Sequence, residues 1–99
     1  EHVYAATGLK SFDRIEINKI CLSHEPLESF HGYNICGHIH PGIRLVGKAN
    51  QSVRIPCFHV KENQMILPAF GSLTGLYIVE PKVDEIVFGI ADSTLIRYE

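Results

Sequence analysis

The apolar residues of this chain lie in runs of only a few positions, and residues typical of turns end each run. Examples are the runs at 33–36 and 43–46, which are followed by Gly37 and Gly47. Runs this short favour strands, because a helix needs a longer segment with apolar residues three or four positions apart. The sequence holds no long amphipathic helical pattern, no repeat and no low-complexity segment. It therefore predicts a mostly β fold of short strands joined by tight turns.

Two further segments carry specific expectations. The segment 15–22 begins with alternating apolar and polar residues and ends apolar, which is typical of one strand that enters a core. Pro56, within the segment 53–60, predicts an edge strand or a bulge, because proline lacks a backbone N–H. Further strands are expected at 3–6, 65–67, 76–79, 85–90 and 94–98, with turns at 7–8, 47–52, 61–64, 81–84 and 91–93 and a loop or single helical turn at 27–32.

Composition indicates one small globular domain. The chain has 99 residues, of which 45% are hydrophobic and 20% charged, and this balance excludes a disordered chain. A net charge of −2 gives no basic excess of the kind that marks a non-specific nucleic-acid surface. A phosphate-ester enzyme is still compatible with this charge, because bound metal ions supply positive charge.

The predicted localisation depends on the absence of a membrane-spanning or signal-peptide pattern in the sequence and on the state expected for its cysteines. No apolar run is long enough to span a membrane, and no signal-peptide pattern is present. Cys21, Cys36 and Cys57 are odd in number and lie in apolar runs, so we expect reduced, buried thiols. The expectation is a cytoplasmic protein that has no membrane partner.

Two short motifs place histidines directly after apolar runs: Leu-Ser-His-Glu-Pro at 22–26 and Gly-His-Ile-His-Pro at 37–41. In extended backbone, His38 and His40 point to the same side. Gly37 permits a sharp turn before them, and the proline after them favours extended backbone at His40. With His24, three neutral imidazoles then converge, and such a set favours a transition-metal ion such as Mn, Fe, Zn or Ni.

Other polar residues are weaker candidates, and each has an ordinary explanation beside the functional one. Glu25 orients a metal ligand or is a solvated loop carboxylate. Arg44 meets a phosphate or simply lies in solvent. Ser72 and Thr74 line a pocket, or their glycine-containing loop is only a turn. Histidines outside the two motifs are assigned no metal role: His2, His31 and His59.

Four sequence blocks together resemble one protein family. They are Leu-Ser-His-Glu-Pro, Gly-Tyr-Asn-Ile-Cys-Gly-His-Ile-His-Pro-Gly, Arg-Ile-Pro-Cys-Phe and Ile-Leu-Pro-Ala-Phe-Gly-Ser-Leu-Thr-Gly. In this order they resemble the C-terminal half of a calcineurin-like metallophosphoesterase, closest to the bacterial branch associated with DNA ligase and the DNA damage response. The resemblance runs from about Ile17 to the end of the chain. It implies an α/β fold in which residues 1–99 form the C-terminal, mostly β half of a four-layer α/β/β/α sandwich.

The resemblance also implies a chemistry. Two divalent metal ions activate a water molecule to hydrolyse a phosphodiester, and the resemblance to this branch implies DNA or RNA in a repair context as the substrate. By correspondence of motifs, His24 and His38 bind one metal and His40 the other. The family's N-terminal motifs, which supply carboxylate ligands and the catalytic histidine, are absent, so the catalytic residue is unknown. We therefore expect negligible phosphodiesterase activity from this chain alone, and self-association through exposed strand edges.

Two alternatives remain open at this point. In a cupin-like single-metal β-barrel, His59 would be a ligand and His24 would not, although the expected glutamate after His40 is missing. In a non-catalytic β interaction domain, the histidines would bind no metal at all. The metal affinity of His24→Ala and His59→Ala variants separates the first alternative from the phosphoesterase interpretation.

Overall fold

The computed structural model describes residues 14–69 and 75–98, and within them the chain is almost entirely β. The strands expected at 3–6 and the turn at 7–8 lie outside the described residues. The described residues contain one 3-10 turn, η1 (Lys48–Asn50), and nine strands: β1 (Arg14–Ile17), β2 (Ile20–Ser23), β3 (Tyr33–Cys36), β4 (Pro41–Val46), β5 (Ser52–Val60), β6 (Gln64–Ile66), β7 (Tyr77–Ile78), β8 (Ile86–Ala91) and β9 (Thr94–Tyr98).

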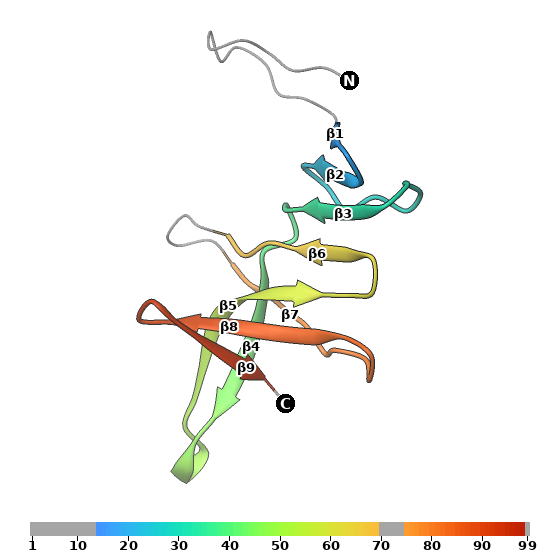
Figure 1. The fold of residues 1–99 in the computed structure, drawn as a ribbon. Helices are drawn as coiled ribbons and strands as arrows, with labels where there is room; N and C mark the ends of the chain where they lie inside the picture. Colours follow the sequence, from blue (N-terminus) through green and yellow to red (C-terminus); the bar gives the residue numbers. More distant parts are fainter. Residues whose placement is uncertain (1–13, 70–74, 99) are drawn as a thin grey trace, which may run out of the picture.

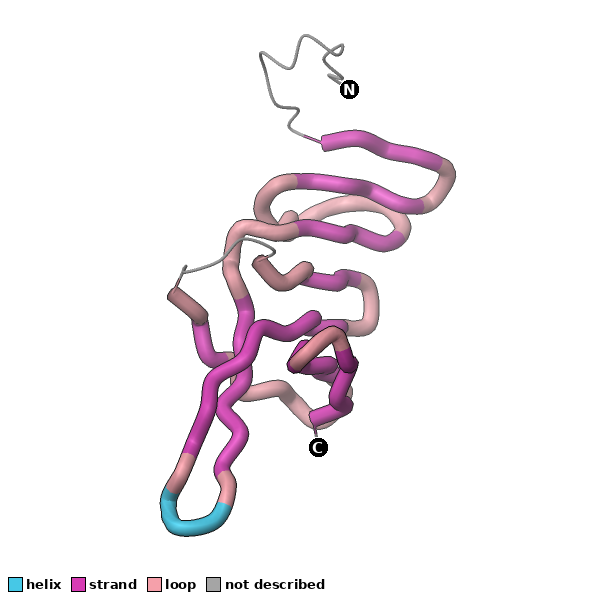
Figure 2. The backbone as a smooth tube through the Cα atoms, turned by 90° about the vertical axis from the view of Figure 1, so that its left-hand side faces the viewer, coloured by secondary structure: helices cyan, strands magenta, loops and turns pink. Residues whose placement is uncertain are grey.

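The strands form a mixed sheet, which agrees with the predicted mostly β character of the chain. Its order is β1-β2-β3-β6-β5-β4-β7, and β8 pairs with β5 and carries β9 on its other side (Figure 1). The pairs β2–β3, β3–β6 and β4–β7 are parallel, and the others are antiparallel. Strand β1 lies at one end of the molecule. The hairpin of β4 and β5 extends beyond the other strands at the opposite end, with η1 at its tip (Figure 2).

Most of the predicted strands are confirmed within a residue or two, but the segment 15–22 is not one strand. It is a tight antiparallel hairpin of β1 and β2, in which Ile15 pairs with Leu22 and Ile17 with Ile20. The chain reverses at Asn18, whose φ is 55°. Asparagine tolerates this left-handed conformation better than most residues, so a turn forms without glycine or proline.

The prediction from Pro56 holds only locally: β5 as a whole is a central strand, but as far as Pro56 its only ladder partner among the described residues is β4. Its first half pairs with β4 as far as Pro56, and from Cys57 onward it pairs with β8. The proline stands where β5 exchanges one partner for another. Its missing N–H therefore falls at the end of a ladder, where it costs less than in the middle.

The core lies where β4, β5, β7 and β8 meet, and its members are almost completely buried: Ile43, Ile55, Cys57, Val79 and Val87. A Cβ at position 89 would lie 2.6 Å from the side chain of Ile55, so any residue other than Gly89 would force core side chains to shift. All three cysteines are free and buried, as predicted. Among the described residues, no helix is long and apolar enough to cross a membrane.

Candidate metal centre

The two histidine motifs begin at neighbouring strand ends. His24 follows β2 directly, and His38 and His40 lie between β3 and β4. Because β2 and β3 are parallel, with Ser23 opposite Cys36, both chains leave the sheet at the same edge. The amide of Gly37 then donates a 2.9 Å hydrogen bond to the carbonyl of His24, which ties the two loops together.

This arrangement brings two imidazoles into contact. His24 Nε2 lies 3.0 Å from His38 Nδ1, and the rings meet edge to face with centroids 4.8 Å apart. Two nitrogens that share one metal ion at about 2.0–2.1 Å lie roughly 2.9–3.4 Å apart, depending on the coordination angle. The separation therefore fits one bound metal as well as a direct hydrogen bond. Both residues are exposed, so an ion can reach them from solvent.

His40 does not follow the predicted arrangement. The expectation of extended backbone is wrong, because φ is 78° at His38 and 59° at His40. A hydrogen bond from Ile39 N to Gly37 O (2.9 Å) closes a tight turn centred on His38, which accounts for the positive φ at that residue. His40 is half-buried, and its carbonyl accepts a hydrogen bond from Tyr77 N. Within residues 14–69 and 75–98, no three metal-binding side chains form one cluster, so this chain offers a pair of nitrogens rather than a complete site.

Left-handed backbone at two histidines is unusual and costly. Residues other than glycine in this region cost of order 1–3 kcal/mol each, and they persist where the surroundings hold them firmly. Such residues cluster at functional sites. Because Asn18, Ala49, Asn50, Asp92 and Ser93 have positive φ in other turns, this conformation at His38 and His40 marks a tight turn and does not by itself indicate function.

A buried polar network holds the loop that carries His24. Asn34 is completely buried in β3, and its amide donates to the carbonyl of Cys21 (2.8 Å) and to Ser23 Oγ (3.0 Å). Its Oδ1 accepts hydrogen bonds from Leu27 N (3.2 Å) and Gln64 Nε2 (2.9 Å). The network joins β2, β3 and β6 to the loop after His24. Satisfied buried polar groups of this kind rigidify their surroundings.

The other predicted candidates are not drawn into this centre. Glu25 is exposed, and only its backbone carbonyl is engaged, by Ser23 Oγ at 2.7 Å. Arg44 is exposed on β4, beyond the core. Ser72 and Thr74 lie outside the described residues. The contact to Gly37 is made by its backbone, so its role is to bring the two loops together.

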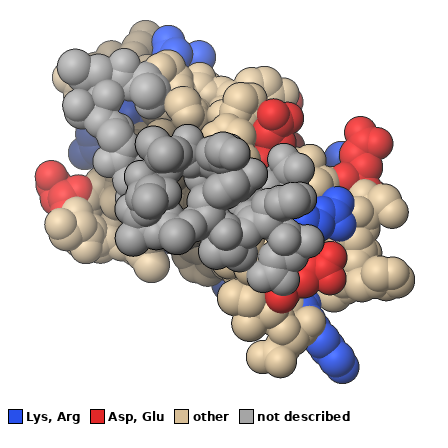
Figure 3. All heavy atoms as spheres, turned by 90° about the horizontal axis from the view of Figure 1, so that it is seen from above, with Lys and Arg blue, Asp and Glu red and all other residues tan. Residues whose placement is uncertain are grey.

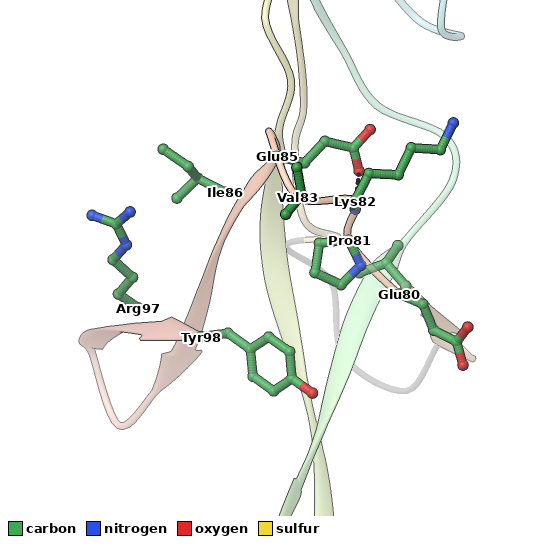
Figure 4. A pocket seen from close by; sticks show the side chains of 9 residues that line it. Glu80, Pro81, Lys82, Val83, Glu85, Ile86, Arg97 and Tyr98 are labelled. Carbon is green, nitrogen blue, oxygen red and sulfur yellow. Dashed lines mark hydrogen bonds between the residues drawn. The ribbon is translucent and has the colours of Figure 1, made fainter.

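Sequence reasoning missed a buried histidine–carboxylate pair beside this centre. His59 Nε2 lies 2.8 Å from Glu85 Oε1, and the two side chains are only 9% and 12% exposed. The same oxygen accepts a 3.0 Å hydrogen bond from Lys82 N (Figure 4). Burial raises the pKa of Glu85, but the hydrogen bonds from Lys82 and His59, with the charges of His59 and Lys61, outweigh burial and bring the pKa below its ordinary value.

The ion pair lines a cavity of about 700 Å³ that also contains His38 and Tyr77. The alternation of His59 with Cys57 in β5 indicates a buried histidine, which needs a partner. That the partner is Glu85 depends on packing across 26 positions, which no local pattern reveals. The structure thus pairs His59 with a carboxylate and brings His24 to His38.

Comparison with known proteins gives an informative similarity to a solved structure. No protein-family model matches the sequence, and a search of curated protein sequences finds no match. Among solved structures, the crystal structure of the Pseudomonas putida nuclease MPE is similar, with a TM-score of 0.71 and 26% sequence identity. The similarity covers 85% of this chain and 40% of that nuclease, so the chain spans less than half the length of its structural neighbour.

Proposed function

We propose that this chain is the C-terminal part of a metal-dependent phosphodiesterase domain whose substrate is a nucleic acid. In the complete domain, it would form the mostly β half of a four-layer α/β/β/α sandwich. The observation that carries the proposal is the 3.0 Å separation of His24 Nε2 and His38 Nδ1, reached by two loops that leave parallel neighbouring strands. The similarity to a nuclease over most of this chain supports the substrate class.

The residues present fit a metal ion, because imidazole nitrogens suit Mn, Fe, Zn and Ni. His24 and His38 would bind one ion, and His40 would contribute to a second. Two such ions, when bound, lower the pKa of a water molecule and stabilise charge on the phosphoryl oxygens. The protein's own contribution is to fix the two imidazoles, through the hydrogen bond between the Gly37 and His24 backbones and through the Asn34 network.

The test is titration calorimetry of the chain with Mn²⁺ and Zn²⁺, beside His24→Ala, His38→Ala and the control His31→Ala. His31 is an exposed loop residue outside the site, so its removal subtracts one imidazole without affecting the pair. We expect stoichiometric binding in the parent chain and in the control, and its loss in both site variants. Binding that survives His24→Ala would remove the support for a shared ion.

A cupin-like site is not proposed. It requires His59 as a ligand and leaves His24 aside, whereas His59 is paired with Glu85 and His24 is in contact with His38. Calorimetry separates the cupin-like site from the proposed histidine pair, because His59→Ala should leave metal binding unchanged if His24 and His38 bind the ion.

A further inference from the structure

The hairpin of β4 and β5 carries an unusual arrangement of charge. The segment 41–60 contains Arg44, Lys48 and Arg54 and no acidic residue, although the chain as a whole has 11 acidic and 9 basic residues. Elsewhere the signs are mixed: seen from above, both basic and acidic side chains appear around the atoms drawn in grey (Figure 3). The hairpin is therefore a basic element on a chain that is slightly acidic overall.

The strand register places the two arginines directly opposite each other. Arg44 and Arg54 are Cα partners across the antiparallel pair, so their side chains rise from the same face of the hairpin. Both are exposed, and Lys48 is exposed at the tip. Cross-strand partners have Cβ atoms about 4.5–5.5 Å apart, and like charges in this position destabilise a hairpin. The pair therefore costs stability.

Nothing in the described part of the chain compensates that cost. Across residues 14–69 and 75–98, neither Arg44 nor Arg54 forms an ion pair or a side-chain hydrogen bond. A repulsive pair without a counter-charge is best explained by an anionic ligand that binds both guanidinium groups. Guanidinium binds phosphate through two parallel hydrogen bonds, which makes a phosphate group the best-matched ligand.

The hairpin is continuous with the metal-binding loop, and this continuity identifies the ligand. Strand β4 begins at Pro41, directly after His40. Four residues of strand span about 13 Å, at roughly 3.3 Å per residue. Phosphates along one strand of duplex DNA advance about 3.4 Å per nucleotide, so the distance corresponds to about four nucleotides. A polyanion with regularly spaced phosphates can therefore contact both the histidine loop and the arginine pair, whereas a single phosphate can contact only one of them.

We propose that Arg44 and Arg54 bind the phosphate backbone of a nucleic acid a few nucleotides from the bond positioned at the histidine loop. The inference rests on the proposed function for the choice of ligand. In this proposal Arg44 and Arg54 together bind the nucleic-acid strand, and Lys48 makes an additional contact at the tip of the hairpin. The contacts carry no base specificity, because they reach only the backbone.

The experiment is fluorescence anisotropy of a labelled 20-base-pair DNA duplex, titrated with the chain in EDTA at several KCl concentrations. EDTA removes the metal contribution, so the hairpin is tested apart from the metal site. Each phosphate contact adds about 0.9 to the slope of log affinity against log salt concentration. We expect Arg44→Gln/Arg54→Gln to lower that slope by about 2 and to weaken binding, and Arg44→Lys/Arg54→Lys to retain most of the slope.

The matched control is Arg14→Gln/Lys19→Gln, which removes the same charge from the β1–β2 hairpin at the far end of the molecule (Figure 1). This control is expected to keep the parent slope. Removal of the arginine pair relieves repulsion, so its unfolding temperature is expected not to fall. An unchanged slope in the arginine variant, an equal loss in the control, or no DNA binding by the parent chain would overturn the proposal.

The two proposals fail separately. If His38→Ala abolishes metal binding and leaves the salt slope intact, both are supported. If the arginine variant loses its slope while the parent chain binds no metal, the hairpin inference stands and the metal-centre proposal falls. If metal binds at the histidines and the arginine variant keeps the parent slope, the metal-centre proposal stands and the hairpin inference falls.

Discussion

Replacement of Asn34 by alanine tests whether the buried network supports the histidine pair. The substitution removes four hydrogen bonds, to Cys21 O, Ser23 Oγ, Leu27 N and Gln64 Nε2. At a net contribution of about 0.5–1.5 kcal/mol each, the loss is about 2–6 kcal/mol. A domain of this size has a total stability of roughly 5–15 kcal/mol, so the loss is a large fraction of it.

Urea denaturation measures this loss. With a slope of about 1–3 kcal/mol per molar urea, Asn34→Ala lowers the midpoint by about 1 M or more. Asn34→Asp keeps the volume and the Oδ1 acceptor but places a carboxylate against the carbonyl of Cys21, so it also destabilises at neutral pH. The control Asn63→Ala changes an exposed residue in the neighbouring turn and shifts stability by less than about 0.5 kcal/mol.

The same substitution has a functional consequence. Because Leu27 N loses its hydrogen bond to Asn34, the loop that begins at His24 loses one of its anchors. Removal of a group that orients a metal ligand typically weakens binding by about 10–100-fold. We expect such a loss in Asn34→Ala under conditions where the variant is folded. A midpoint within 0.3 M of the parent chain, or an unchanged metal affinity, would refute the reasoning.

Three further predictions concern the ion pair, the thiols and activity. Glu85→Gln lowers stability at pH 7 by about 1–3 kcal/mol, because a charged partner of buried His59 is lost. The pKa of Glu85 in the folded protein lies below its ordinary value of 4.5. The denaturation midpoint of Glu85→Gln should therefore fall short of the parent midpoint by the full amount above pH 4.5, and the difference should shrink as the pH falls through the folded pKa. A difference that stays constant with pH would contradict this. Burial raises the pKa of Cys36 and of Cys57 to about 11, so both thiols should react with Ellman's reagent at pH 8 only on the timescale of unfolding, and immediate labelling would be inconsistent. Hydrolysis of an aryl phosphodiester by this chain with Mn²⁺ is expected to equal that of His38→Ala, and robust turnover lost in the variant would show that the chain is catalytically sufficient.

The strand pattern was largely predictable because short apolar runs and turn residues are local signals. The run Tyr33–Cys36 followed by Gly37, and the run Thr94–Tyr98 after a polar turn, were both expected. The hairpin at Asn18 was missed because its turn contains neither glycine nor proline. The central position of β5 was missed because Pro56 alone does not reveal that a strand changes partner along its length.

The candidate site was predictable only in part, for a related reason. Residue type and spacing pointed to His24, His38 and His40, and the parallel pairing of β2 with β3 brings the first two together. The left-handed turn at His38 and His40 depends on a backbone hydrogen bond that the sequence does not indicate. The opposition of Arg44 to Arg54 likewise depends on the register of a hairpin, which spacing across a loop does not fix.

The measurement that tests the central claim most directly is a double-mutant cycle of metal affinity for His24 and His38. Affinity for Zn²⁺ is measured in the parent chain, His24→Ala, His38→Ala and the double variant, at one pH and salt concentration. If the two nitrogens bind one ion, each single substitution removes most of the affinity and the double variant is little worse than either. Losses that add independently, or a parent chain that binds no metal, would show that the 3.0 Å contact is only a hydrogen bond between two imidazoles.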